Sequence, residues 1–210
     1  MTRKSLLSPA ALLLIALVSA PAKDHEDHKP AAVVVVLRFD QTYSPVALDA
    51  MKDELGLLLR PAAVHLEWRF YEESLGAEIF SRLAVVRFRG ACRMGEFPPS
   101  AEESSALALT HASDGVIIPY ADVECDHLRR MIQPVVGREN FPRREMLLGR
   151  ALGRVLAHEL YHVLTRNATH HKDGITKPVL SPRELVLDPI EFEDSAVEGL
   201  RRSDESDSPR

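Results

Sequence analysis

The sequence has few cysteines, no strong charge of one sign and no long apolar run, and each shortage argues against a class of protein. Two cysteines in 210 residues argue against a disulfide-rich scaffold and against a zinc site built from cysteine pairs. The net charge of -5 gives no reason to expect nucleic acid or an anionic membrane as a partner. No segment reaches the ~20 apolar residues that a membrane span needs. The remaining composition, 45% hydrophobic and 27% charged, is that of an ordinary globular domain.

The first residues have the layout of a secretory signal peptide. Arg3 and Lys4 precede an apolar run of residues 6–18, and small residues follow as far as Ala22. We therefore expect a signal peptide at residues 1–22, cleaved after Ala20 or Ala22, and a secreted or periplasmic protein. The alternative is an N-terminal anchor that stays attached.

The two cysteines are consistent with export. In an oxidising compartment an even number of cysteines predicts a disulfide, here between Cys92 and Cys125. The bond would close a loop of roughly 30 residues and stabilise the fold by about 3 kcal/mol. Two free buried thiols are the alternative.

The chain is long enough for one domain, which we place at residues 32–200, after a flexible leader at 23–31. The charged, serine-rich residues 201–210 predict a disordered tail. Alternation and β-branched runs predict strands at residues 33–39, 64–70, 83–89, 106–110 and 115–120. Helical spacing predicts helices after Ser44, after a cap at Asp126, and at residues 143–165. This order predicts an α+β (α/β-like) fold, a small mixed sheet packed on helices.

Within the last predicted helix, residues 158–162 read His-Glu-Leu-Tyr-His, the H-E-x-x-H pattern of zinc hydrolases. Positions four apart lie on one face of a helix, so His158 and His162 can point two imidazoles at one metal. Glu159 is placed to take the proton of a metal-bound water. Tyr161 faces elsewhere on the helix and is assigned to packing.

A catalytic zinc takes three protein ligands, and the third is open between several residues. His170 is the first candidate, because Asn167 tolerates the left-handed conformation that would turn the chain back toward the metal. His171 and a downstream carboxylate are the alternatives. The downstream candidates are Glu184, which also fits a capping box with Ser181, and Glu191 and Glu193, which alternate with apolar residues as solvent-facing charges would.

The motif resembles the zincin metallopeptidases, and the order of elements resembles their metzincin branch. There the active-site helix follows a small mixed sheet, and a third histidine follows a glycine turn. The resemblance implies one zinc ion per chain, held by His158, His162 and His170, with Glu159 as general base. It covers residues 158–171 as a motif and residues 33–165 as a weaker match in strand order.

The chain departs from the metzincin pattern at three points. That pattern would need glycine at Thr165 and histidine at Ala168, and it includes a methionine turn, whereas this sequence has no methionine after Met146. The sequence therefore resembles a divergent zincin.

These observations predict an exported zinc metallopeptidase that hydrolyses peptide or protein substrates. The alternative is a zincin-shaped binding or structural protein whose metal site is not catalytic. For the substrate we predict an edge strand that begins at Gly115 and ends at Tyr120. Pro119 is tolerated only at an edge or a bulge, and an edge can bind an extended peptide as an added strand.

Overall fold

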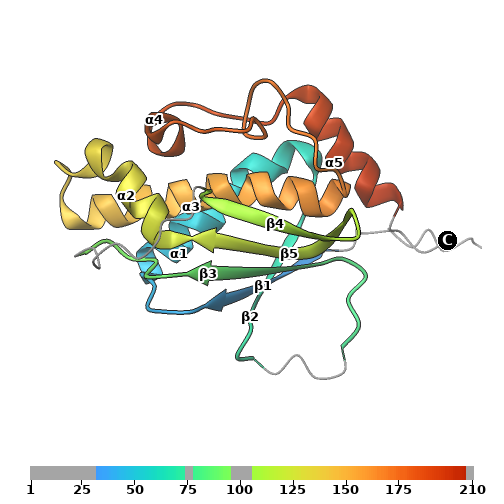
Figure 1. The fold of residues 1–210 in the computed structure, drawn as a ribbon, viewed down its shortest axis with the longest axis horizontal. Helices are drawn as coiled ribbons and strands as arrows, with labels where there is room; N and C mark the ends of the chain where they lie inside the picture. The colour runs from blue at the N-terminus through green and yellow to red at the C-terminus, as the bar shows by residue number, and fades with distance from the viewer. Residues whose placement is uncertain (1–31, 74–77, 96–105, 207–210) are drawn as a thin grey trace, which may run out of the picture.

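Five strands form one mixed sheet in the order β2-β1-β3-β5-β4 (Figure 1). The computed structural model describes residues 32–73, 78–95 and 106–206. Strands β2, β1, β3 and β5 are parallel, and β4 is antiparallel to β5. The strands are β1 (Val33–Phe39), β2 (Leu66–Phe70), β3 (Leu83–Arg89), β4 (Ala108–Ser113) and β5 (Val116–Glu124). The predicted mixed sheet is confirmed, and β1 and β3 have the predicted bounds. The predicted signal peptide and leader lie outside the described residues.

The helices pack on the sheet and enclose a single apolar core with it. They are α1 (Pro45–Leu59), the short 3₁₀ turn η1 (Arg60–Ala62), α2 (Cys125–Val136), α3 (Phe141–Thr165), α4 (Pro182–Val186) and α5 (Asp194–Ser206). Local signals set several helix starts. The Ser44 side chain accepts from the backbone N–H of Ala47, as predicted. The Asn140 side chain caps α3, which begins two residues before the predicted start. None of the helices described is both long and apolar enough to cross a membrane.

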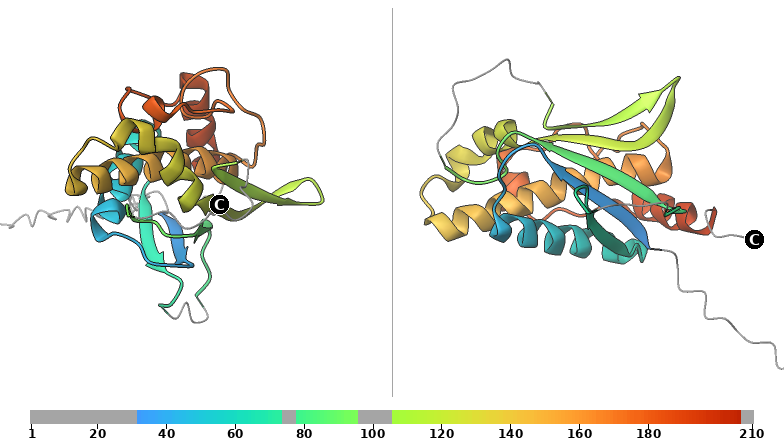
Figure 2. Two further views of the ribbon diagram at one scale, coloured as in Figure 1. Left: turned by 60° about the vertical axis from the view of Figure 1, so that its left-hand side comes forward. Right: turned by 90° about the horizontal axis from the view of Figure 1, so that it is seen from below.

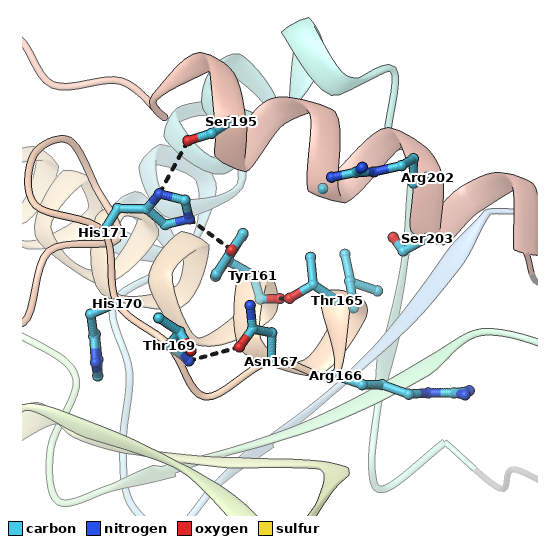
Figure 3. A pocket seen from close by; sticks show the side chains of 12 residues that line it. Tyr161, Thr165, Arg166, Asn167, Thr169, His170, His171, Ser195, Arg202 and Ser203 are labelled. Carbon is cyan, nitrogen blue, oxygen red and sulfur yellow. Dashed lines mark hydrogen bonds between the residues drawn. The ribbon is translucent and has the colours of Figure 1, made fainter.

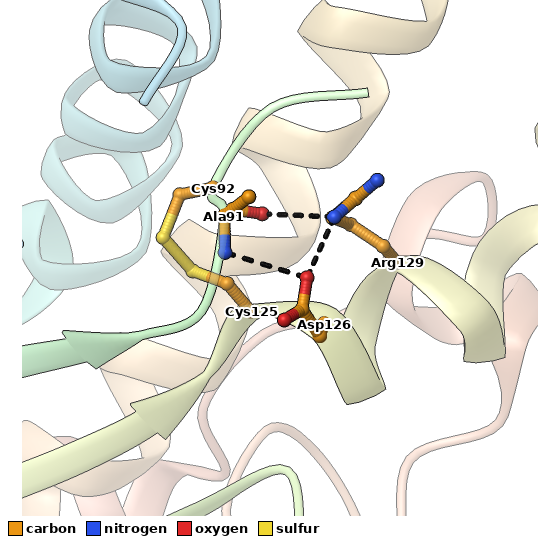
Figure 4. Close-up of a disulfide and its surroundings, with 5 residues drawn as sticks. All are labelled: Ala91, Cys92, Cys125, Asp126 and Arg129. Atoms are coloured by element: carbon orange, nitrogen blue, oxygen red, sulfur yellow. Dashed lines mark hydrogen bonds and ion pairs between the residues drawn. A yellow bond between two sulfur atoms is a disulfide. The ribbon is translucent and has the colours of Figure 1, made fainter. Parts of the chain in front are cut away.

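The predicted cap at Asp126 is wrong, because Asp126 lies inside the first turn of α2 and Glu124 holds the cap position. The Asp126 carboxylate instead accepts from the backbone N–H of Ala91 and pairs with the buried guanidinium of Arg129 at 2.6 Å (Figure 4). This cluster lies beside the disulfide between Cys92 and Cys125, whose Cα atoms are 5.1 Å apart. The predicted disulfide is therefore present, and it ties the end of β3 to the start of α2.

The predicted substrate strand at residues 115–120 falls in the first part of β5. In the sheet as described, β5 pairs with β3 only from Tyr120 onward, so residues 116–119 have a strand neighbour on the β4 side alone, and β4 is the outermost strand. The tight turn at Asp114 and Gly115, both with positive φ, folds β4 and β5 into a hairpin. Pro119 falls where the register between the two strands shifts, as a bulge requires.

The C-terminal helix corrects the predicted tail. Helix α5 continues to Ser206, beyond the predicted domain end, and residues 207–210 lie outside the described residues. Arg201 donates a hydrogen bond of 2.6 Å to the carbonyl of Pro61, which holds this part of the helix against η1. The local composition is that of a tail, but the tertiary contact favours the helix.

Helices α1 and α3 lie side by side on the same face of the sheet (Figure 2). Two glycines of α3 permit this close approach. A Cβ at Gly149 would lie 2.3 Å from the carbonyl oxygen of Ala47, and one at Gly153 would lie 2.8 Å from that of Met51. Both obstacles are backbone atoms, which cannot rotate away. The contact therefore fixes the position of the helix that carries the H-E-x-x-H motif.

Replacing Gly149 by alanine should destabilise the fold by about 1–3 kcal/mol, because the added methyl group overlaps the backbone of α1. Gly56→Ala in α1 is the matched control. A Cβ at Gly56 meets nothing within 4 Å, so this change should stabilise the helix by about 0.5–1 kcal/mol. Urea denaturation of both variants measures the two free energies of unfolding. Equal stability of Gly149→Ala and the wild type would contradict the close contact.

Candidate metal centre

The H-E-x-x-H motif lies in the C-terminal part of α3, which is covered on nearly every side. The sheet packs on one face of the helix, and α1, α4 and α5 contact other faces. Glu159 is 6% exposed and His162 is 5% exposed, while His158 is partly buried. Burial of polar groups is costly unless they have partners, so the surroundings of these side chains decide what they can do.

The chain turns back over α3 immediately after the motif. The left-handed residue at the helix end is Arg166, with φ 50°, one residue before the predicted Asn167. Asn167 instead has two other contacts. Its carbonyl lies 2.6 Å from Nδ1 of His162, and its side-chain oxygen accepts from the backbone N–H of Thr169. The turn therefore supports the motif directly.

Both motif histidines have the same arrangement of ring nitrogens. Nδ1 of His158 lies 2.9 Å from the carbonyl of Ile175, as Nδ1 of His162 does from that of Asn167. A carbonyl oxygen can only accept, so each Nδ1 carries the proton and each neutral ring keeps a lone pair on Nε2. These two Nε2 atoms lie 3.1 Å apart and point at each other.

Two facing lone pairs repel each other, and a cation bound between them removes that repulsion. Burial lowers the pKa of both His158 and His162, with smaller opposing effects of the carbonyls that accept from their Nδ1 atoms. The charged form of either ring is therefore disfavoured. Metal-bound histidines commonly donate their second N–H to a carbonyl in this way. The two rings fit a metal ligand pair.

His170 completes a group of three. One ring nitrogen of each of His158, His162 and His170 lies within 4.8 Å of the others. No other cluster of three or more potential ligands is found among the residues that the structure describes. His170 is exposed and belongs to the segment that returns over α3. The structure thus brings together the three histidines that the sequence analysis predicted as ligands.

The alternative third ligands lie elsewhere. The ring of His171 points away from the cluster, toward Tyr161 and Ser195 (Figure 3). Glu184 forms the predicted capping box with Ser181 and also contacts Lys177. Glu191 is exposed, and Glu193 accepts from the backbone N–H of Asp173.

Glu159 has a partner that the sequence analysis missed. The hydroxyl of Thr110, on the edge strand β4, donates to Oε2 of Glu159 at 2.6 Å. Burial raises the pKa of the Glu159 carboxyl, and the hydrogen bond from Thr110 opposes this shift. No motif marks Thr110. Its only signal is its position in a predicted strand, and strand pairing across the sheet is needed to bring it to α3.

A cleft of about 450 Å³ opens beside these groups. It is lined by residues of β4, by the segment 177–180, and by Glu159 and the three histidines. Of the predicted substrate strand at residues 115–120, only Ile117 lines this cleft. The remaining lining is largely apolar and includes Leu107, Met131, Val155 and Leu180.

A second cavity, of about 590 Å³, lies between the end of α3 and α5 (Figure 3). It is lined by His170 but not by His158, Glu159 or His162, and most of its other side chains are polar. The smaller cleft is therefore the one that gives access to the motif.

Comparison with known proteins gives a likeness in fold. No family model matches the sequence, and no curated protein matches it. Among solved structures, the chain is similar to archaemetzincin from Methanopyrus kandleri, with a TM-score of 0.50 over 83% of this chain and 97% of that one. The two sequences are 12% identical. At this identity the likeness shows the fold alone, a mixed sheet packed on helices in the manner of archaemetzincin.

Proposed function

We propose that this chain is an exported zinc-dependent metallopeptidase with His158, His162 and His170 as metal ligands. One observation carries the proposal, the two Nε2 lone pairs that face each other at 3.1 Å. Two nitrogens bound to a tetrahedral zinc at 2.0–2.1 Å lie about 3.3 Å apart, close to this separation. The fold likeness to a protein named as a metzincin supports the same reading, and the disulfide is compatible with export.

Glu159 is the group that moves protons in this proposal. Thr110 holds its Oε2, which leaves Oε1 to accept a proton from the attacking water. Zinc would lower the pKa of that water toward about 7 and polarise the substrate carbonyl. The carboxyl, whose pKa is raised by burial, is suited to keep the proton briefly and then donate it to the leaving amine.

The substrate of such a site is an extended peptide. β4 is the sheet edge, and from Ala108 to Ala112 most of its residues line the cleft above Glu159. A peptide that pairs with this strand would pass over the cluster with its scissile bond near the metal ligands. The apolar side chains in the cleft favour an apolar residue in the bound segment.

Elemental analysis tests the ligand set. The wild-type protein should contain about one zinc per chain, and His170→Ala should lose most of it, because two histidines leave the site one ligand short. Glu191→Ala is the matched control, since Glu191 is exposed and outside the cluster. No zinc in a folded wild type supplied with metal would overturn the proposal. Loss of zinc in the control instead would move the third ligand to the carboxylate.

Glu159→Gln separates catalysis from metal binding. The amide keeps the size of the side chain but is a poor base, so hydrolysis should fall by a factor of at least about 10² while zinc content stays unchanged. Cleavage of denatured casein and of a quenched fluorescent peptide library measures the activity. A variant that hydrolyses both as fast as the wild type would exclude Glu159 as the base. A zinc-loaded wild type that cleaves neither would support the non-catalytic alternative.

The lone-pair arrangement also predicts how pH acts on the metal-free protein. The pKa values of His158 and His162 are lowered from an ordinary value of 6.5, so near that pH the unfolded chain binds protons that the folded chain does not. The free energy of unfolding is therefore highest above pH 6.5, where neither state binds these protons, and it decreases as the pH falls below 6.5.

The melting temperature of the metal-free protein should therefore fall between pH 7 and pH 5.5. A His158→Gln/His162→Gln variant should fall less over the same interval. Glu159 acts in the opposite direction, because its pKa is raised, so only the difference between the two proteins reports on the histidines. Parallel curves would show that neither ring is held neutral by the fold.

A further inference from the structure

His171 follows the proposed third ligand directly, and its ring is fixed on two sides. Its Nε2 lies 2.8 Å from the hydroxyl of Tyr161 on α3, and its Nδ1 lies 3.2 Å from the hydroxyl of Ser195 on α5 (Figure 3). Glu193 adds a carboxylate oxygen 3.5 Å from the same Nδ1. Both ring nitrogens therefore have partners, and none of these partners belongs to the histidine cluster.

The backbone of His171 is fixed as well. Its N–H donates to the carbonyl of Thr176 at 3.2 Å, which closes residues 171–176 into a loop. The residue before Thr176 is Ile175, whose carbonyl supports His158. The loop thus begins directly after His170, and near its other end it contains the carbonyl that accepts from His158.

Tyr161 connects His171 to the proposed metal ligands, because it contacts both His171 and His162. It lies inside the H-E-x-x-H motif, its side chain is buried, and its ring centroid is 5.5 Å from that of His162. His170 is exposed, and its ring is in contact with those of the two motif histidines at centroid distances of 5.0 and 4.8 Å. An exposed ring loses conformational entropy when it binds a metal. This loss is smaller when the loop that carries the ring is already held in place.

We propose that His171 is a positioning residue that holds the loop of the third metal ligand against the motif helix through Tyr161. The inference rests on the proposed function, because it requires a metal at the three histidines. The two adjacent histidines then have different roles. The ring of His170 contacts the two motif histidines, whereas the ring of His171 contacts Tyr161 and Ser195 and so holds the backbone that carries His170.

The test measures the zinc dissociation constant by competition with a chromophoric chelator, on protein that is folded without metal. His171→Ala and Tyr161→Phe should each weaken zinc binding by roughly 10- to 100-fold, with about one zinc still bound at saturation. The double variant should be no weaker than the worse single one, because both changes break the same contact. Tyr161→Phe removes only a hydroxyl, so it remains informative if His171→Ala folds poorly.

His65→Ala is the control, since His65 is exposed and lies outside the cluster. It should bind zinc as tightly as the wild type. A purely structural role of His171 would lower the melting temperature without changing the dissociation constant of folded protein, and that result overturns the inference. Wild-type affinity in both single variants overturns it as well. A wild type that binds no zinc overturns the proposed function and this inference together, whereas the other failures leave the proposed function standing.

Discussion

The hydrogen bonds from Nδ1 of His158 and His162 to backbone carbonyls are the contacts on which the rest of the site depends. They fix the tautomer of each ring, aim both Nε2 atoms at one point, and tie the segment after α3 back onto the helix. The carbonyls come from Asn167 and Ile175, on either side of His170. The same two bonds therefore orient two of the proposed ligands and restrict the position of His170, so the return segment is part of the candidate site and not only a connection.

The fold places the remaining parts around that point. The glycines at positions 149 and 153 let α3 approach α1 closely, which leaves the other side of α3 to face β4. β4 is the outermost strand, and Thr110 on that strand reaches Glu159. A single strand thus provides both the outermost strand of the sheet and the hydroxyl that contacts the proposed base. In the proposed function, peptide binding and the orientation of Glu159 therefore depend on one element.

Much of this could be predicted from local sequence signals, and the failures share a cause. Ser44 and the capping box at Ser181 act through neighbouring residues, so the sequence is sufficient to predict them. The position of β4 as the outermost strand could not be predicted, because strand order is decided by pairing between distant segments. Thr110 was missed for the same reason. Asp126 has the composition of a cap, but Arg129 and the backbone of Ala91 compete for its carboxylate. Composition also suggested a tail where a contact with Pro61 favours a helix.

The departures from the metzincin pattern can be explained together. That pattern would place glycine at Thr165 and histidine at Ala168, whereas here α3 continues through Thr165 and the left-handed residue is Arg166. The chain therefore leaves the helix later and reaches the cluster by a longer path, with its histidine at position 170. A longer connection restricts the position of His170 less than a short turn would. The contacts of His171 with Tyr161 and Ser195 supply a constraint from outside the turn.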